Sequence, residues 1–386
     1  MRQQLYFTTL ALMLFSIASI YSMSLYPGLY LGVSANYFLL RDTVAVIIAI
    51  LLMTYIANLN PDKMFTPLGF ILFILFFIII IAMLFMPESI VKSVKGAKRW
   101  IKIGSVSLAP TEFFKYGFLF FLAWSLERKN KILQQTKGLW NEFIVITPYF
   151  ILLAIAIMIL AIAQKDLGQS VVLLFTTLAL LFLSGRSKKF FVTLMGATIL
   201  LVLLLILIAP HRINRFKGWW VGVQDSILSL LPQSIANSFK VTDTTEALPI
   251  VNARYAFENG GFLGQGLGAG QYKLGFISEV HTDFIFAGLG EEIGFIGIFI
   301  ILLLFAYMIT LIFKIGSRLE SLKERYFTYG VGIILFLSLA INLYGVTGII
   351  PEKGIAVPIL SYGGSQLVAT ATAIGMVLML AKRIKE

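Results

Sequence analysis

Long apolar runs recur along the whole chain, and they constrain its fold more than any other feature. The runs cover residues 5–25, 38–58, 67–87, 111–127, 143–164, 168–184, 190–209, 283–313, 326–346 and 364–381. A helix of about 20 residues crosses the roughly 30 Å hydrocarbon core of a bilayer, where every backbone polar group must be paired within the protein. Because 59% of the residues are hydrophobic and only 13% are charged, the sequence predicts an all-α polytopic membrane protein with about ten transmembrane helices.

Basic residues indicate how such a bundle is oriented. An even number of spans puts both chain ends on one side, and the run 5–25 is interpreted as a retained span because no small-residue cleavage site follows it. The ends and short connections on that side hold Arg2, Lys63, Arg128, Lys129, Lys131, Lys137, Arg186, Lys188, Lys189, Lys314, Arg318, Lys323, Arg325, Lys382, Arg383 and Lys385. The positive-inside rule therefore predicts that both termini are cytoplasmic.

The opposite, external side is predicted to carry two large loops within a single integral membrane domain, residues 1–386. The first loop, 88–110, is short yet holds five cations, Lys92, Lys95, Lys98, Arg99 and Lys102. This excess runs against the charge rule and has two interpretations, an external binding site for an anion or anchoring at lipid headgroups. The second loop, 210–282, connects the seventh and eighth spans, and its Trp219 and Trp220 suggest segments that lie on the membrane surface.

An acid stands where the eighth apolar run begins. Asp283 follows His281 and Thr282, and six glycines precede them between residues 260 and 270. A carboxylate at the start of a membrane helix is costly unless it has a function there, and glycines let backbone turn sharply or approach a ligand closely. The glycines have the G-x-G spacing of a nucleotide loop, but no preceding strand or βαβ unit is visible. A flexible loop is therefore the simpler interpretation of the glycines.

Carboxylates are the candidates for proton transfer in this chain, with Asp283 foremost. There is no cysteine, which excludes disulfides and thiolate metal sites, and two histidines argue against a histidine-built metal site. The sequence also lacks a nucleophile elbow and a Ser/His/Asp motif. The formal net charge of +12 favours contact with anionic lipid headgroups over nucleic acid.

Two charged motifs lie close together in the sequence, one in the first external loop and one at the start of the fourth span. Lys98 and Arg99 precede Trp100, which is either part of a cationic site or an anchor at the membrane interface. Glu112 and Lys115 open the fourth span, and a spacing of three residues places them on one helix face, where they can form an ion pair. Such a pair inside a membrane helix is either structural or functional.

Three further motifs are predicted to reach the same side. Asp166 lies between the fifth and sixth spans, and Lys115 or Lys165 is the expected partner for its charge. Arg41 stands beside Asp42 at the start of the second span, where the two could pair. Two prolines and three glycines between residues 351 and 364 prevent a straight helix, and irregular backbone at this depth is tolerated only where it is buried in protein or lines a cavity. Because these motifs and the Asp283 segment are all predicted to lie on the external side, the sequence predicts one external site.

Small residues form a stripe on the eighth span, at Ala287, Gly290, Gly294 and Gly297. Their spacings of three and four residues place them on one helix face, and small residues allow helices in a membrane to approach closely. The stripe either packs inside the protein or receives the single helix of a partner.

Four blocks of this sequence resemble the signature blocks of a known family. The blocks GAKRWI…PTEFFK, QKDLGQ, SEVHTDFIFAGLGEEIG and PEKGIAVPILSYGGS are similar to those of the SEDS family, the FtsW/RodA-type peptidoglycan glycosyltransferases, and the likeness covers the whole chain. The segments KGIAVPILSYGGS and GLGAGQYKLG resemble the division branch, FtsW, more than the elongation branch, RodA. The resemblance implies polymerisation of lipid II into β-1,4 glycan strands on the outer face of the cytoplasmic (inner) membrane, in cell division or elongation.

The resemblance also implies roles for single residues. Asp283 corresponds to the proposed catalytic aspartate of the family, Lys115 to the lysine of its P-x-E-x-x-K block and Asp166 to the aspartate of its Q-P-D-L-G block. The chain departs from the family at Lys165, where proline is usual, and at Ala109, where glutamine is common. Ser107 stands where division members often carry arginine, so substrate contacts in the first loop are the least secure inference.

A mechanism follows from the chemistry and the resemblance together. The enzyme is expected to be an inverting glycosyltransferase with an undecaprenyl-pyrophosphate-linked donor, Asp283 as base and cations for the leaving pyrophosphate. The expected substrate-binding residues are Arg41, Lys98, Arg99, Trp100, Glu112, Lys115, Asp166, His281, Thr282, Lys353 and Ser361. A divalent cation, Mg²⁺ or Mn²⁺, would suit the pyrophosphate, although the sequence shows no ligand set for it.

Partners follow from the resemblance as well. They are lipid II, a class B penicillin-binding protein with transpeptidase activity, other divisome or elongasome membrane proteins, and membrane lipids, but no nucleic acid. The chain itself has no S-x-x-K block of a serine transpeptidase. Two alternative functions remain open, a lipid II flippase with the same cationic cavity and a non-catalytic membrane scaffold for a transpeptidase.

Overall fold

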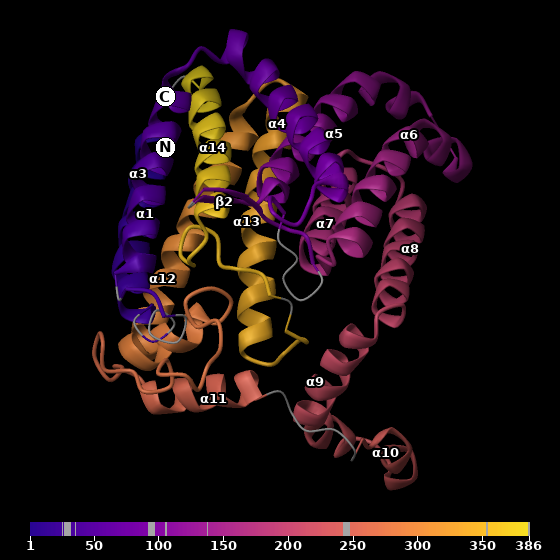
Figure 1. Ribbon diagram of the computed structural model, residues 1–386. Coiled ribbons are helices and arrows are strands. Elements are labelled where there is room, and N and C mark those ends of the chain that lie inside the picture. Colours follow the sequence, from indigo (N-terminus) through magenta and orange to yellow (C-terminus); the bar gives the residue numbers. More distant parts are fainter. Residues whose placement is uncertain are drawn as a thin grey trace.

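The computed structural model is a bundle of long helices with a smaller helical layer at one end (Figure 1). It describes residues 1–24, 26, 32–34, 36–91, 97–104, 106–136, 138–241, 248–352 and 354–384. The helices are α1 (Arg2–Met23), α3 (Tyr37–Asn58), α4 (Pro61–Phe85), α5 (Pro110–Gln135), α6 (Leu139–Met158) with a π-helical extension (Ile159–Ala163), α7 (Leu167–Leu183), α8 (Lys188–Leu207), α9 (Pro210–Leu228), α10 (Gln233–Phe239), α11 (Leu248–Gly260), α12 (Ile285–Arg318), α13 (Leu322–Val346) and α14 (Gly364–Leu380) with a terminal 3-10 turn (Ala381–Arg383). An antiparallel hairpin of β1 (Ile101–Ile103) and β2 (Val106–Leu108) precedes α5.

Within the described residues, eight helices are long and apolar enough to cross a membrane, which confirms a multi-pass membrane protein. They are α1, α3, α4, α6 with its extension, α8, α12, α13 and α14 with its terminal turn. The other two expected spans, 111–127 and 168–184, fall in α5 and α7. α7 is apolar but has only 17 residues, and α5 carries Glu112 and Lys115 near its start. The number of crossings therefore stays a prediction.

Both chain ends lie at the same end of the bundle, as an even number of spans requires (Figure 1). The guanidinium of Arg2 donates to the carbonyl of Ala57 at 3.1 Å, and the ammonium of Lys382 donates to the carbonyl of Leu59 at 3.1 Å. The connection between α3 and α4 is therefore next to both termini. We call the opposite end, where α9, α10 and α11 lie, the loop end.

Close backbone packing holds the centre of the bundle together. α14 packs against α3 and α5, and most of its side chains are buried. A Cβ added at Gly375 of α14 would lie 3.0 Å from the carbonyl oxygen of Met53, and one added at Gly117 of α5 would lie 2.4 Å from the backbone of Leu72. Lipid tails are as apolar as these side chains, so tight packing at small residues is a main source of helix association in membranes.

The stripe of small residues on the eighth span is internal packing. Its helix, α12, is broken at Gly294, whose φ of 66° is left-handed, and a Cβ there would lie 2.3 Å from the amide nitrogen of Gly264. The amide of Phe295, which the break frees from the helix, donates to the carbonyl of Gly261 at 2.9 Å. Ala287 on the same stripe is fully buried. The glycine-rich loop, residues 261–273, therefore occupies this face at Gly294, and the ring of Phe257 from α11 occupies it at Gly290.

The chain between α8 and α12, predicted as one large loop, is largely helical. α9 begins three residues after α8 ends, and α11 packs along α12 at the loop end (Figure 1). Residues 261–284 then fold back against α12 and lead into its first turn. This arrangement brings the glycine-rich loop, the start of α12 and the segment after α13 to the same end of the molecule.

Candidate active site

Asp283 lies in the turn that enters α12, and hydrogen bonds to its backbone fix this turn. Inside the turn, the amide of Thr282 donates to the carbonyl of Glu279 at 3.0 Å. From α13, the Nδ2 of Asn342 donates to the carbonyl of Asp283 at 2.7 Å and to the carbonyl of Ile355 at 2.7 Å. The Asn342 side chain is only 5% exposed, so one buried amide joins the Asp283 turn to the segment after α13.

The irregular backbone before α14 packs against the same turn. The Oγ of Ser361 donates to the carbonyl of Thr282 at 2.6 Å and accepts a hydrogen bond from the amide of Val357 at 2.9 Å. The amide of Tyr362 donates to the carbonyl of His281 at 2.9 Å. The structure therefore uses Ser361, predicted as a substrate ligand, to hold two backbone segments together.

The carboxylate of Asp283 faces the backbone of Gly354. A Cβ added at Gly354 would lie 3.2 Å from the Oδ2 of Asp283, and its φ of +60° is left-handed. A larger residue would therefore crowd the carboxylate and strain the backbone. In the part of the chain that the structure describes, no side chain donates a hydrogen bond to this carboxylate, which leaves it available to a ligand.

Burial changes the protonation of this carboxyl group. Solvent reaches one edge of Asp283 while protein surrounds most of it, and this desolvation raises its pKa to about 7. The negative charges of Glu279 and Glu352 contribute to this rise of the pKa, whereas the charges of Arg215 and Arg99 oppose it. A general base is most effective when its pKa lies near the working pH. The environment of Asp283 therefore suits proton acceptance.

His281 is packed among aromatic rings. It is 8% exposed, and its ring centre lies 4.8 Å from that of Phe38 and 5.7 Å from that of Tyr362. Burial lowers the pKa of His281, which favours the neutral imidazole. The guanidinium of Arg41 lies 4.5 Å above the ring of Tyr37 and also contacts the Tyr362 hydroxyl. Arg41 is thus placed beside the turn that carries Asp283.

The expected local pair of Arg41 and Asp42 is absent from the described part of the chain. Asp42 is 2% exposed and hydrogen-bonds with Ser16 of α1. Successive residues on a helix point about 100° apart, because there are 3.6 residues in each turn. The two charges therefore face different neighbours, Asp42 toward the interior of the bundle and Arg41 toward Tyr37.

Asp166 forms its ion pair with Arg99 and not with either expected lysine, Lys115 or Lys165, although the charge of Lys115 also acts on Asp166. The Nε of Arg99 lies 3.7 Å from the Oδ2 of Asp166 and donates to the carbonyl of Gln164 at 3.1 Å. One terminal nitrogen of Arg99 donates to the carbonyl of Lys165 at 2.6 Å. Asp166 also caps α7 by accepting a hydrogen bond from a first-turn amide at 3.2 Å. Arg99 thus ties the stretch before β1 to the turn that leads into α7.

Lys115 is a buried counter-charge. Its ammonium lies 2.5 Å from the Oε2 of Glu112, which confirms the pair predicted from their spacing, and the Nε2 of Gln169 donates to the Oε1 of Glu112 at 2.8 Å. Lys115 is 1% exposed, and the Tyr116 ring centre lies 5.4 Å from its ammonium. A buried charge requires such compensation, so these contacts join α5 to α7 within the bundle.

Two of the predicted residues, Lys98 and Trp100, have no ion pair or ring contact in the described part of the chain. Lys98 is half-buried and Trp100 is 37% exposed in the stretch before β1. Lys353 lies outside the described residues. The same described ranges contain no group of three His, Cys, Asp or Glu side chains that could hold a metal ion.

Two carboxylates that the sequence analysis did not single out hold the glycine-rich loop onto α12. Glu291 accepts hydrogen bonds from the Nδ2 of Asn259 at 2.7 Å and from two loop amides at 2.8 and 3.0 Å. Glu292 accepts from the Oγ of Ser22 at 2.6 Å and forms an ion pair with Lys273. Adjacent acids inside an apolar run are the signal that could have identified them, because such acids need partners.

Asn342 and Arg215 were also missed. Asn342 is a polar residue in the ninth apolar run, which makes it unusual, but its contact with Asp283 spans 59 residues of sequence. Arg215 lies in α9, and only the fold brings its charge within range of Asp283. Neither role has a local sequence signal.

The similarity to known proteins is extensive. A profile of the FtsW/RodA/SpoVE family, described as cell cycle proteins, matches residues 3–386. The chain is 43% identical over 385 residues to the "Probable peptidoglycan glycosyltransferase FtsW" of Helicobacter pylori (strain J99 / ATCC 700824), covering 99% of each chain. It is 34% identical over 292 residues to the protein of that name from Escherichia coli O157:H7, covering 75% of this chain and 64% of the other.

Solved structures share the fold. The Thermus thermophilus rod shape determining protein RodA superposes with a TM-score of 0.63 and 22% identity, covering 99% of this chain and 97% of the other. A chain from a structure described as "Structural coordination of polymerization and crosslinking by a peptidoglycan synthase complex" gives a TM-score of 0.65 at 22% identity, with 98% and 96% covered. Because the family profile spans nearly the whole sequence, this chain belongs to the FtsW/RodA/SpoVE family of cell cycle proteins.

Proposed function

We propose that this protein is a peptidoglycan glycosyltransferase that polymerises lipid II, an undecaprenyl-pyrophosphate-linked disaccharide pentapeptide, into β-1,4-linked glycan strands. The setting of Asp283 carries the proposal: its backbone is held by Asn342, while its carboxyl group, beside Gly354, has a pKa of about 7. The names of the Helicobacter pylori and Escherichia coli relatives support the same activity.

The proposed reaction assigns Asp283 as the general base. A hydroxyl oxygen of the acceptor sugar attacks C1 of the donor, the bond from C1 to the pyrophosphate oxygen breaks, and the hydroxyl proton moves to Asp283. Attack opposite the leaving group converts an α-linked donor into a β-linked product. Positioned proton transfer of this kind contributes about 10²–10⁴-fold to a rate, so Asp283 accounts for a large but partial share of catalysis.

Cations near Asp283 are proposed to stabilise the departing pyrophosphate. Arg99 and Arg215 both act on the charge of Asp283, and Arg41 lies beside the same turn. Lys115 is assigned a structural role instead, because it is buried and already paired. Mg²⁺ or Mn²⁺ could bind through pyrophosphate oxygens, but the described residues offer no ligand group for it, and no step here depends on one.

The membrane orientation and the partner follow from the same proposal. Basic residues gather at the end that holds both termini, so we place the termini in the cytoplasm and the loop end outside the cytoplasmic membrane. New glycan strands require cross-linking, and this sequence has no transpeptidase block. A class B penicillin-binding protein is therefore the proposed partner, and one structural neighbour comes from a complex described as coordinating polymerization and crosslinking.

Purified full-length protein incubated with lipid II tests the proposal. Wild type is expected to form glycan polymer, and Asp283→Asn is expected to form it at least about 10²-fold more slowly while remaining folded. Movement of lipid II across a proteoliposome membrane without polymer would favour a flippase. If the protein forms no polymer and moves no lipid II but stimulates a transpeptidase, the result would favour a scaffold.

A further inference from the structure

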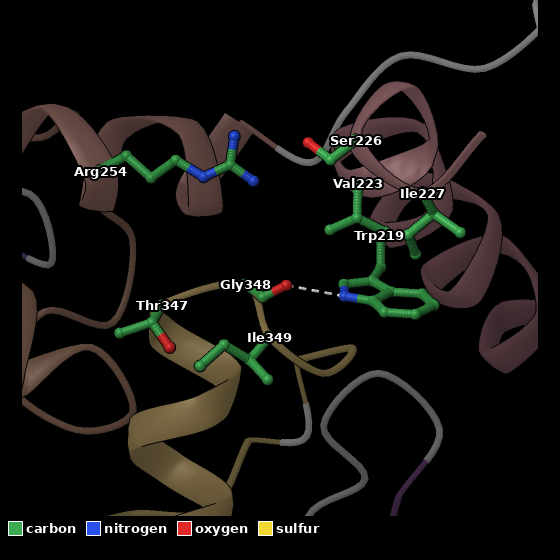
Figure 2. Close-up of a pocket in the computed structure, with 9 residues that line it drawn as sticks. Trp219, Val223, Ser226, Ile227, Arg254, Thr347, Gly348 and Ile349 are labelled. Carbon is green, nitrogen blue, oxygen red and sulfur yellow. Dashed lines mark hydrogen bonds between the residues drawn. The ribbon is translucent and has the colours of Figure 1, made fainter. Parts of the chain in front are cut away.

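A pocket of about 480 Å³ opens at the loop end, outside the Asp283 site (Figure 2). It lies between α9, α11 and the turn that follows α13. Its walls include Trp219, Val223 and Ile227 of α9, Arg254 of α11, and Gly348 and Ile349 after α13. A volume of roughly 300–1,000 Å³ is usual for pockets that bind small molecules.

Direct contacts fix the walls of this pocket relative to one another. The Nε1 of Trp219 donates to the carbonyl of Gly348 at 2.8 Å. A Cβ added at Gly348 would lie 3.2 Å from a terminal nitrogen of Arg254, and the φ of Gly348 is +75°. Figure 2 shows the guanidinium of Arg254 directed into the space between α11 and Trp219. Three separate elements therefore line one open pocket.

The lining has the chemistry of a site for an anion with an apolar part. Arg254 is the charged lining residue, and none of the lining residues is acidic. Val223, Ile227 and Ile349 supply aliphatic surface, and Trp219 supplies an aromatic wall. A guanidinium presents a planar fork of donors that matches phosphate oxygens.

The position of the pocket indicates that the anion is a lipid phosphate. α8 ends at Leu207, three residues before α9 begins, and α13 ends at Val346, next to the lining residues 347–349. Both α8 and α13 are candidate membrane spans, so the pocket lies where spans emerge from the bilayer. Lipid phosphates occupy this level, and a tryptophan is common there.

We propose that this pocket binds the phosphate group of a lipid, with Arg254 as the phosphate ligand and the α9 side chains against the adjoining apolar part. The lipid is either a bilayer phospholipid or a polyprenyl diphosphate, since both offer negatively charged phosphate oxygens next to a long apolar chain. Binding at this site does not depend on the proposed glycosyltransferase activity.

The pocket adjoins the Asp283 site through two elements. On α9, Arg215 precedes Trp219 by four residues, so the two share a helix face, and the charge of Arg215 acts on Asp283. After α13, Ile349 is followed five residues later by Gly354, which faces the Asp283 carboxylate. A lipid in the pocket therefore contacts α9, which carries Arg215, and the segment after α13, which carries Gly354.

Native mass spectrometry of the delipidated full-length chain, titrated with phosphatidylglycerol, tests the proposal. Arg254→Gln is expected to weaken binding of the first lipid by about tenfold, because a charge-assisted hydrogen bond is lost. Lys217→Gln is the matched control, since it removes one positive charge from α9 at an exposed position outside the pocket. Equal binding by wild type and Arg254→Gln, or an equal loss in both variants, would overturn the proposal.

A second pair of variants covers the case in which Arg254→Gln does not fold. Ser226 lines the pocket and is exposed, so Ser226→Glu adds a negative charge there without disturbing packing. It is expected to weaken phosphatidylglycerol binding several-fold, unlike Ser229→Glu one turn further along the chain; equal binding by both would contradict a phosphate site. A parallel titration with undecaprenyl diphosphate identifies the source, because the lipid that binds more tightly with the same dependence on Arg254 is the ligand.

Discussion

Three carboxylates lie within ten residues of one another where α12 begins, yet their surroundings differ completely. Glu291 and Glu292 are 0% and 1% exposed, and each accepts several hydrogen bonds from the glycine-rich loop or from α1. Asp283 is held through its backbone instead, and no described side chain donates a hydrogen bond to its carboxylate. The two glutamates are therefore occupied by the protein, whereas the aspartate is available to a substrate.

The comparison shows how to separate structural from catalytic acids in a membrane protein. A buried carboxylate whose oxygens already accept hydrogen bonds or an ion pair from the protein is costly to free for chemistry. Asp283 differs in two ways that suit a reaction. Its fixed main chain positions the carboxyl group, and the raised pKa of that group lets it accept a proton near neutral pH. Of these three acids, both the position in the sequence and the family resemblance pointed to Asp283, and the structure explains why its two neighbours differ.

The largest effect is expected for Asp283→Asn. The amide cannot accept the acceptor proton, so polymerisation of lipid II should fall by at least about 10²-fold. Melting of the purified protein should not change, because no described side chain bonds to the carboxylate. Glycan synthesis near the wild-type rate would remove Asp283 as the base.

Glu292→Ala should act on stability. It leaves Lys273 buried without its partner, which costs about 3–5 kcal/mol, so the melting temperature and the yield should fall. Replacing the pair together, Glu292→Leu with Lys273→Met, should recover most of the loss. A Glu292→Ala protein that melts like wild type but forms no polymer would reverse the distinction between the acids.

Asn342→Leu should slow catalysis without removing the base. The substitution deletes both hydrogen bonds to the carbonyls of Asp283 and Ile355, each worth about 1–3 kcal/mol when a buried group is left unpaired. We expect kcat to fall by about tenfold to a hundredfold with KM little changed, and Asn342→Gln to recover part of the rate. A change confined to KM would argue against a positioning role for Asn342.

The smallest effect is expected for Lys115→Ala. Glu112 keeps its hydrogen bond from Gln169, so the loss of stability should be about 1–2 kcal/mol. If Lys115 is only a counter-charge, adding Glu112→Gln should restore both the melting temperature and polymer formation. Failure of that rescue, with a raised KM for lipid II, would instead make Lys115 a substrate ligand.

Much of the fold was predictable because bilayer physics leaves few alternatives. Apolar runs gave the long helices, and an even number of runs correctly put both termini together. The interior of the 210–282 segment was not predictable in detail, because its helices depend on packing against α12. The break at Gly294 was also missed, since a glycine inside an apolar run does not reveal that residues 261 and 262 will bond to the helix there.

The site was predictable only where the signal is local. Glu112 and Lys115 pair as their helical spacing indicated. Asp166 was assigned the wrong partner because Arg99 is 67 residues away in sequence and reaches it only through the folded first loop. The substrate contact expected of Ser361 stays a prediction, and the hydrogen bond of its hydroxyl to the carbonyl of Thr282 is a contact that no spacing could have indicated.

The pH dependence of kcat for lipid II polymerisation tests the central claim most directly. A base must be ionised to act, and the raised pKa of Asp283 is about 7, so the rate should rise with pH through about 7 and level off above it. Asp283→Asn should show no such rise in its residual rate. A wild-type rate that is constant from about pH 5 upward would mean an acid with its usual pKa near 3.8, and would contradict Asp283 as a base tuned by burial.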